Sequence, residues 1–304
     1  MPRSSNTADP VATDLELQLL PAAAAARSLL KKRFKQVIGL LPLAAEDPDG
    51  DIEHVHRLRV ATRRAGAALA AFSPLMERKP SDAKKALRNI RRAAGPARDA
   101  DVLWLRLAER AGEPFVDRIA GPRLRAQRDD AQRALCSAAT KRRSKRLRAA
   151  LRDAVALLNS PDESSTAFGE FAGSTVEDAA DRFRVASQAD LSGWHELHQL
   201  RIAGKRLRYT LELFDSELAE EAREAAASAT KALQNRLGAI NDHATAQAHY
   251  QRWIGGMSAD ADAALLAAEI VSESARAEAL ATDFHAWWAG EGEHALAAAV
   301  DRLS

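Results

Sequence analysis

The amino-acid sequence predicts an all-α protein made of two related halves, and three observations point to that fold class. Hydrophobic residues fill 46% of the 304 positions, enough for a sizeable core, whereas aromatic residues fill only 5%. A core rich in alanine and other small residues favours closely packed helices over sheets. The 15 Gly and 11 Pro are too few for the many tight turns of a strand-rich fold. The third observation is an internal repeat.

Helical periodicity interrupted by breakers organises the first half. A loose arm is expected over residues 1–13. The Pro/Asp/Gly cluster at 45–51, Pro74 and Gly95-Pro96 are expected to end helices, because a residue that precedes proline is disfavoured in the helical conformation. The predicted helices span about 14–40, 52–73, 81–94 and 98–111, followed by a long, very basic helix over about 114–158.

A polar segment rich in breakers, residues 159–170, is the best candidate for a linker. We therefore expect a first helical bundle over 14–158 and a second over 171–304, with about four long helices in each. No strand is predicted. The helices predicted in the second half span about 171–187, 192–216, 217–239, 242–255, 258–289 and 291–303.

The net charge of +2 hides a strong asymmetry. Residues 1–158 hold 32 Lys and Arg against 18 Asp and Glu, whereas residues 159–304 hold 12 against 24. Two interpretations stay open: the basic half has an anionic partner, or the two halves attract each other.

The single cysteine, Cys136, excludes an intrachain disulfide and a four-thiolate zinc site. Acidic residues interrupt the N-terminal segment where a signal peptide would be apolar. No stretch approaches the roughly 20 apolar residues of a membrane span. We therefore expect a cytoplasmic protein with no membrane partner.

The internal repeat joins HRLRVATRRAGAALAAF (56–72) to HQLRIAGKRLRYTLELF (198–214), which align without a gap and share seven of seventeen residues. Further on, GPARD (95–99) resembles GAIND (238–242). Such a pattern is typical of a duplicated helical bundle.

Each repeat carries a stripe of cations on one side of its helix. With successive residues about 100° apart, positions 0, 3, 7 and 10 lie within an arc of roughly 80°. The stripe lies beside the apolar side of the helix, so we expect it to line a groove or channel. Its members are His56, Arg59 and Arg63 in the first repeat and His198, Arg201, Lys205 and Arg208 in the second.

These residue types suit phosphate groups. Arg offers a planar fork of donors, Lys adds a mobile charge, and His gains charge as the pH falls. On the repeated face no carboxylate occurs before Glu212, so the like charges need an anion from elsewhere. Carboxylates on other helices remain the structural alternative.

A second repeated set has a different predicted role. Arg64 and Arg206 point to another side of their helices, and Asp99 and Asp242 are also repeated. We expect these Arg and Asp residues to form cross-helix ion pairs that fix the bundles.

The two repeats, together with GPARDADVL (95–103), resemble the CHAD family, the conserved histidine α-helical domain, over about residues 14–304. The resemblance implies two four-helix bundles related by pseudo-twofold symmetry around a basic central channel. It also implies binding of inorganic polyphosphate and targeting to polyphosphate granules, with the seven stripe residues as ligands. Gly66 stands where the second repeat has Arg208, so the site is expected to be asymmetric.

Further cations are candidates for extending the site. One set recurs every four residues on the first predicted helix, and another flanks the third and fourth. The dense run KRRSKRLR (141–148) is interpreted as a solvated helix that contributes only non-specific attraction. The additional candidates are Arg27, Lys31, Lys35, Arg88, Arg91, Arg92 and Arg98.

Other function classes fit less well. HELH (195–198) lacks the spacing of the HExxH zinc motif, and Gly204-Lys205 lacks the rest of a phosphate loop. We therefore expect a binding protein without catalytic residues, metal or cofactor. A divalent-metal-dependent phosphohydrolase stays open as an alternative. Nucleic acid stays open as a weaker alternative polyanion, because only Tyr209 lies near the stripes for base stacking.

Overall fold

The computed structural model describes residues 20–46, 51–160, 166–255, 257 and 261–303. Within these residues the chain is helical, apart from turns and two isolated β-bridges, Pro21 with Ala167 and Met76 with Leu158. The predicted all-α class is thus confirmed. The arm predicted over residues 1–13 lies outside the described residues. None of the described helices has the length and apolar character needed to cross a membrane.

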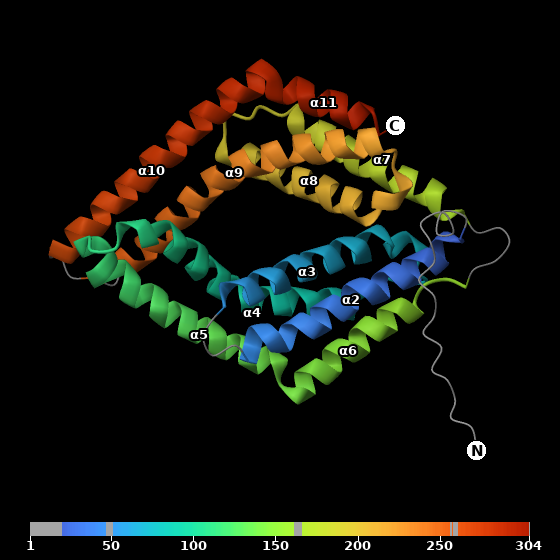
Figure 1. Ribbon diagram of the computed structural model, residues 1–304, viewed down its shortest axis with the longest axis horizontal. Helices are drawn as coiled ribbons and strands as arrows, with labels where there is room; N and C mark the ends of the chain where they lie inside the picture. Colours follow the sequence, from blue (N-terminus) through green and yellow to red (C-terminus); the bar gives the residue numbers. More distant parts are fainter. Residues whose placement is uncertain (1–19, 47–50, 161–165, 256, 258–260, 304) are drawn as a thin grey trace.

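Each half contains five helices in its described residues, where about four were expected, and a short π-helical turn near a helix junction. Figure 1 shows the helices of the first half on one side and those of the second half on the other, with α3 and α4 opposite α8 and α9. This layout is consistent with the expected pseudo-twofold relation. The helices are α2 (Ala22–Glu46), α3 (Ile52–Ala71), α4 (Ser81–Leu107), α5 (Gly121–Ala139), α6 (Lys141–Ala156), α7 (Phe168–Ser187), α8 (Trp194–Leu213), α9 (Glu220–Ile254), α10 (Ala261–Trp287) and α11 (Glu293–Asp301), and the π-helical turns are Phe115–Ala120 and Trp288–Gly292.

The larger of the two hydrophobic core clusters contains residues of both halves. The matching phenylalanines of the two repeats, Phe72 and Phe214, are fully buried and meet edge to face with ring centroids 5.8 Å apart. Helix α7 begins at Phe168, inside the segment expected as a linker, and this residue packs on Phe214. The halves therefore share their apolar centre and are not two separately packed bodies.

The expected break at Gly95-Pro96 is wrong, because α4 continues through both residues. Proline removes one backbone hydrogen bond inside a helix. Here Ala94 and Ala97 are fully buried on either side of it, and this packing holds the helix together. The break expected between residues 239 and 242 is wrong in the same way, since α9 is one uninterrupted helix.

The opposite error occurs in the basic segment, where one helix over 114–158 was expected. The chain leaves the helical conformation at Thr140, with φ −53° and ψ 146°, and thereby separates α5 from α6. Neither Gly nor Pro marks this turn. It lets Leu147 and Leu151 of α6 become buried in the shared core.

Candidate functional site

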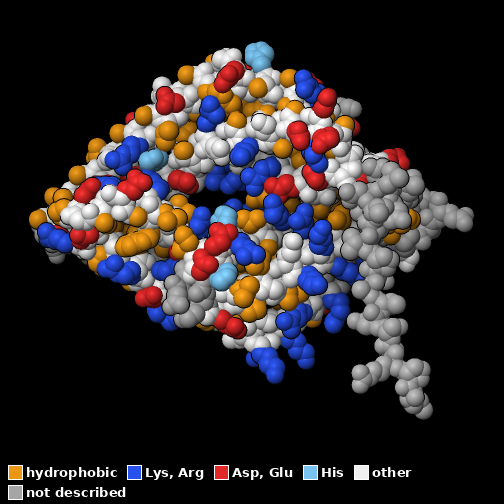
Figure 2. Space-filling view, viewed as in Figure 1, with side chains coloured by type: hydrophobic (Ala, Val, Ile, Leu, Met, Phe, Trp, Pro, Cys, Tyr) orange, Lys and Arg blue, Asp and Glu red, His pale blue; other side chains and the backbone are white. Residues whose placement is uncertain are grey.

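A cavity of about 350 Å³ lies between α3, α4, α8 and α9, so both halves of the protein build its wall. Figure 2 shows a hollow at the centre of the molecule with Lys, Arg and His side chains gathered around it. The lining residues include His56, Arg59 and Arg63 from α3, Arg98, Asp99 and Arg106 from α4, Arg201 and Lys205 from α8, and Asn241, Asp242, Thr245 and His249 from α9.

The cavity thus contains members of both predicted stripes. From the first repeat, His56, Arg59 and Arg63 all line it; from the second, Arg201 and Lys205 do so. The apolar residues beside the stripes are buried, as the helical spacing requires. The two repeated helices therefore place their cations on a common surface.

Two further hollows continue this surface. One, of about 360 Å³, is lined by Arg59, Arg63, Arg91, Arg92 and Lys205. The other, of about 710 Å³, adds Lys84, Lys85, Arg88 and Arg206 around the same Arg63 and Lys205. We call the surface formed by the three connected hollows the basic track. Arg63 and Lys205 occur in all three and mark its middle.

Two glycines allow helices and side chains to approach closely along the track. A Cβ at Gly95 would lie 3.3 Å from Nη1 of Arg59, so this glycine leaves room for the guanidinium against α4. A Cβ at Gly204 would lie 2.8 Å from Nε2 of Gln234, which holds α8 close to α9. The Gln234 amide donates to the carbonyl of Arg201 at 3.3 Å.

The track cations have few protein partners. Among the residues that the structure describes, Arg63, Arg98, Arg201 and Lys205 form no ion pair, and Arg59 has only Asp99 at 3.9 Å. The Nε of Arg201 is buried without a hydrogen-bond acceptor. Buried donors of this kind carry a cost in free energy that an anion would relieve.

The crowding of cations alters their proton affinities. Burial, together with Arg201, Arg63 and Arg208, lowers the pKa of Lys205 to about 7, and Asp242 offsets this only in part. Burial and nearby Arg98 lower the pKa of His56. The site is therefore less charged at neutral pH than its composition indicates, and an anion would restore the missing protons.

Two predicted ligands lie outside the cavity. His198 is exposed, and Nε of Arg208 lies 3.2 Å from Oε1 of Glu212 while its guanidinium lies over the ring of Tyr209. Among the additional candidates, Arg98 lines the cavity and Arg88, Arg91 and Arg92 line the connected hollows. Arg27, Lys31 and Lys35 line none of them, and Arg27 donates to the carbonyl of Leu158 at 3.2 Å.

The ion pairs expected between the repeated Arg and Asp residues are wrong. Nε of Arg64 donates to Glu212 at 2.7 Å, across the boundary between the halves. Asp99 lies instead near Arg59. Asp242 accepts at its backbone carbonyl, from Arg106 at 3.0 Å. Equal spacing in two repeats placed these residues on helix faces but could not identify their partners.

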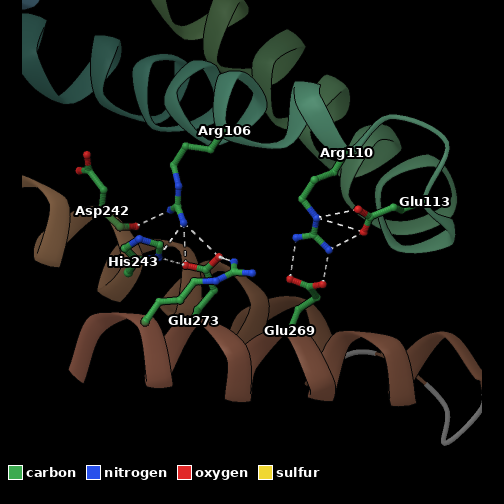
Figure 3. A network of polar contacts seen from close by, with 8 residues as sticks. Arg106, Arg110, Glu113, Asp242, His243, Glu269 and Glu273 are labelled. Atoms are coloured by element: carbon green, nitrogen blue, oxygen red, sulfur yellow. Dashed lines mark hydrogen bonds and ion pairs between the residues drawn. The ribbon is translucent and has the colours of Figure 1, made fainter. Parts of the chain in front are cut away.

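Figure 3 shows a network that ties the end of α4 to the second half. Arg106 donates to both oxygens of the buried Glu273 at 3.0 and 2.8 Å, and Nδ1 of His243 lies 2.6 Å from the same carboxylate. Arg110 pairs with Glu269 at 2.5 Å. Attraction between the halves, one of the two interpretations of the charge asymmetry, is thereby confirmed.

Sequence reasoning missed Arg106 and His249 as cavity residues. Arg106 lies seven positions after Asp99, and His249 lies seven after Asp242, so each shares a helix face with its repeated aspartate. That spacing was a usable signal. In the described residues, no group of three or more His, Cys, Asp or Glu side chains is arranged to hold a metal ion.

Comparisons with known proteins agree with this fold. The chain is similar to the CHAD domain from the plant Ricinus communis, with a TM-score of 0.72, 21% identity, and 93% of each chain covered. It is also similar to PptA from Streptomyces chartreusis, with a TM-score of 0.64, 18% identity, and 88% of this chain and 99% of that chain covered. No curated protein sequence matches. Residues 28–251 match the CHAD domain, and the chain therefore belongs to the CHAD domain family.

Proposed function

We propose that this protein binds inorganic polyphosphate along the basic track. The observation that carries the proposal is the group of cations without ion-pair partners in the described part of the chain, contributed by both halves to one cavity. Like charges this close destabilise the free protein, and a polyanion that neutralises them recovers that free energy on binding.

The shape of the surface favours a linear ligand. Three hollows share Arg63 and Lys205, so a chain that passes these residues can engage cations in each hollow in turn. Arg91 and Arg92 on α4 continue the line beyond the central cavity. Once one phosphate is bound, the next contacts form at high effective concentration. Long chains should therefore bind far more tightly than pyrophosphate.

Nucleic acid carries the same phosphate charge but adds bases, and the track offers little for them to stack on. Apart from histidines, the residues that line the three hollows include one aromatic side chain, Tyr209, and it is buried. We propose preference for polyphosphate over single-stranded DNA on this ground. Association with polyphosphate granules follows as part of the same proposal.

We further propose binding without hydrolysis. The carboxylates that line the central cavity, Asp99 and Asp242, face cations, and one of them lies within 4 Å of an arginine. Phosphoryl transfer assisted by Mg²⁺ or Mn²⁺ needs oxygen ligands gathered around the metal. Incubation with polyphosphate and either metal should release no phosphate; turnover that depends on metal and is lost in a His56→Gln variant would support the phosphohydrolase alternative instead.

The experiment is a calorimetric titration of the protein with long-chain polyphosphate, tripolyphosphate and single-stranded DNA. Two variants test the two halves separately: Arg59→Gln with Arg63→Gln, and Arg201→Gln with Lys205→Gln. A matched control, Lys31→Gln with Lys35→Gln, removes two cationic side chains from exposed positions on α2. Each site variant should weaken long-chain binding by about 100-fold, while the control changes it by about twofold or less.

A steep fall in affinity with added salt is expected for the wild-type protein, because each neutralised phosphate releases bound counterions. If either site variant binds as the wild type does, the two halves do not share one ligand. Equal affinity for tripolyphosphate and the long chain would exclude an extended track.

A further inference from the structure

A separate groove of about 940 Å³ lies on the first half, between α4, α5 and α6. Its wall includes Arg143 and Arg146 from the run KRRSKRLR, together with Lys85 and Arg92 of α4. Every cation of this run is exposed, as expected for a solvated helix, and two of them also border a groove. The turn at Thr140 sets α6 against α4, so these two arginines border a defined groove.

The groove joins the basic track across α4. Arg92 lines both the groove and the hollow that contains Arg59 and Arg63. Lys85 lines both the groove and the hollow that contains Arg88. A polyanion leaving the track between the halves therefore meets these two cations on α4 before it reaches Arg143 and Arg146.

The cations of the groove are available for a ligand. Lys85, Arg92 and Arg146 form no ion pair within the described residues, and Arg143 donates only to the hydroxyl of Ser137, at 2.9 Å. Two carboxylates, Asp82 and Asp153, also border the groove, against four cations. The residues that line the groove therefore carry a net positive charge.

Small residues line part of the groove. Ala134 and Ala138 from α5 and Ala149 and Ala150 from α6 form part of it. Small side chains leave a shallow, open path with cations on its borders, which suits a narrow flexible chain. Figure 2 shows Lys and Arg side chains projecting along the lower edge of the molecule, where Figure 1 places α6.

We propose that the groove between α4, α5 and α6 is a second polyphosphate-binding segment, occupied only by chains long enough to pass from the central cavity over Lys85 and Arg92. This inference rests on the proposed function. A groove on the first half alone makes the whole binding surface asymmetric, because the second half contributes no residue to it. Short chains fill the central cavity and leave the groove empty.

The test compares two double variants on the same helix. Arg143→Gln with Arg146→Gln removes two cations that line the groove, whereas Arg142→Gln with Lys145→Gln removes two exposed cations that line none of the hollows described above. Both variants lose the same charge. Calorimetric titrations with tripolyphosphate and with long-chain polyphosphate measure affinity, and circular dichroism verifies the helix content of each variant.

The groove variant should bind the long chain about tenfold more weakly than wild type and bind tripolyphosphate unchanged, whereas the matched variant should differ from wild type by about twofold at most. Equal losses in the two variants would overturn the proposal in favour of diffuse attraction by α6. No loss in the groove variant would overturn it as well. In both cases the wild type still binds the long chain, so failure of the proposed function, seen as no binding by wild type, is distinct.

Discussion

Two sets of arginines on the same helices have opposite surroundings. On α3, Arg63 lies in the cavity without an ion pair among the described residues, while its neighbour Arg64 is bound to Glu212. On α4, Arg98 likewise has no ion pair in the described part of the chain, while Arg106 holds the buried Glu273. The residue types are the same, and only the positions of second-half carboxylates differ.

The difference separates cations that join the halves from cations available to a ligand. The joining pairs use acidic residues of the second half, such as Glu269 and Glu273, for arginines of the first. Those carboxylates lie near the end of α4, and they form no ion pair with Arg63 or Lys205 in the middle of the track. The charge asymmetry of the chain thus joins the two halves. Under the proposed function, the cations that these carboxylates do not reach bind an anionic partner as well.

The largest effect is expected when a joining pair is broken. Glu273→Ala leaves Arg106 and His243 without their buried carboxylate, and the free energy of unfolding should fall by about 3 kcal/mol. Chemical denaturation measures it. Glu278→Ala, on the same helix but exposed, should cost less than about 0.5 kcal/mol. Polyphosphate should stabilise the Glu273 variant at least as much as wild type, because Arg106 becomes available to the ligand; equal stability of the two variants would contradict this role of Glu273.

The adjacent residues Arg63 and Arg64 should differ most clearly in their effects on affinity and on stability. Arg63→Gln should weaken binding of long-chain polyphosphate about tenfold and leave the free energy of unfolding unchanged or higher, because a like-charge contact is removed. Arg64→Gln should keep affinity within about twofold and lower the free energy of unfolding by about 1 kcal/mol, since a partly exposed pair contributes little. Calorimetric titration measures the affinity of each variant, and chemical denaturation measures its free energy of unfolding. If both variants lost affinity and stability to the same extent, Arg63 and Arg64 would not have different roles.

Lys205 should make binding dependent on pH. With a pKa of about 7 in the folded protein and about 10.4 when unfolded, its charge opposes folding: the cost is fully present below pH 7 and disappears as the pH rises to the unfolded value. Bound phosphate favours the charged form, so affinity should tighten as the pH falls from 8 to 6, by less than about tenfold per unit.

Replacing Lys205 by arginine tests whether protonation of Lys205 causes the pH dependence. Lys205→Arg stays charged and should bind with a much flatter pH profile from 8 to 7, whereas Lys205→Met should be flat and weaker. The pKa of His56 is lowered by burial and by Arg98, so its protonation adds affinity mainly near the acid end. Titrations in buffers of different ionisation enthalpy count the protons taken up, and no uptake in wild type at pH 7 would exclude Lys205 as the source.

The smallest effect is expected at the exposed histidine. His198→Gln should change affinity by less than about twofold at pH 7, because exposed charges are screened and this side chain lies outside the cavity. His56→Gln should cost more, since His56 lines the cavity. Fluorescence competition against a labelled long chain resolves such small ratios. A larger loss at His198 than at His56 would mean that the ligand follows the second stripe outwards.

Much of this protein follows from its sequence alone. The 3.6-residue period placed Leu58, Leu69 and Phe72 on the buried side of their helix, and the structure buries them all. The same period put Arg59 and Arg63 beside that side, where a cavity between helices must lie. These outcomes depend on local spacing and on the burial of apolar surface, which a sequence records directly.

Tertiary structure decided the partners and the breaks. The residues of the Arg64–Glu212 and Arg106–Glu273 pairs are 148 and 167 positions apart, so no local pattern specifies them. Packing of Ala94 and Ala97 carried α4 through Pro96, and packing of Leu147 ended α5 at a turn without Gly or Pro. Local signals compete with long-range burial, and where the buried surface is larger the fold overrides them.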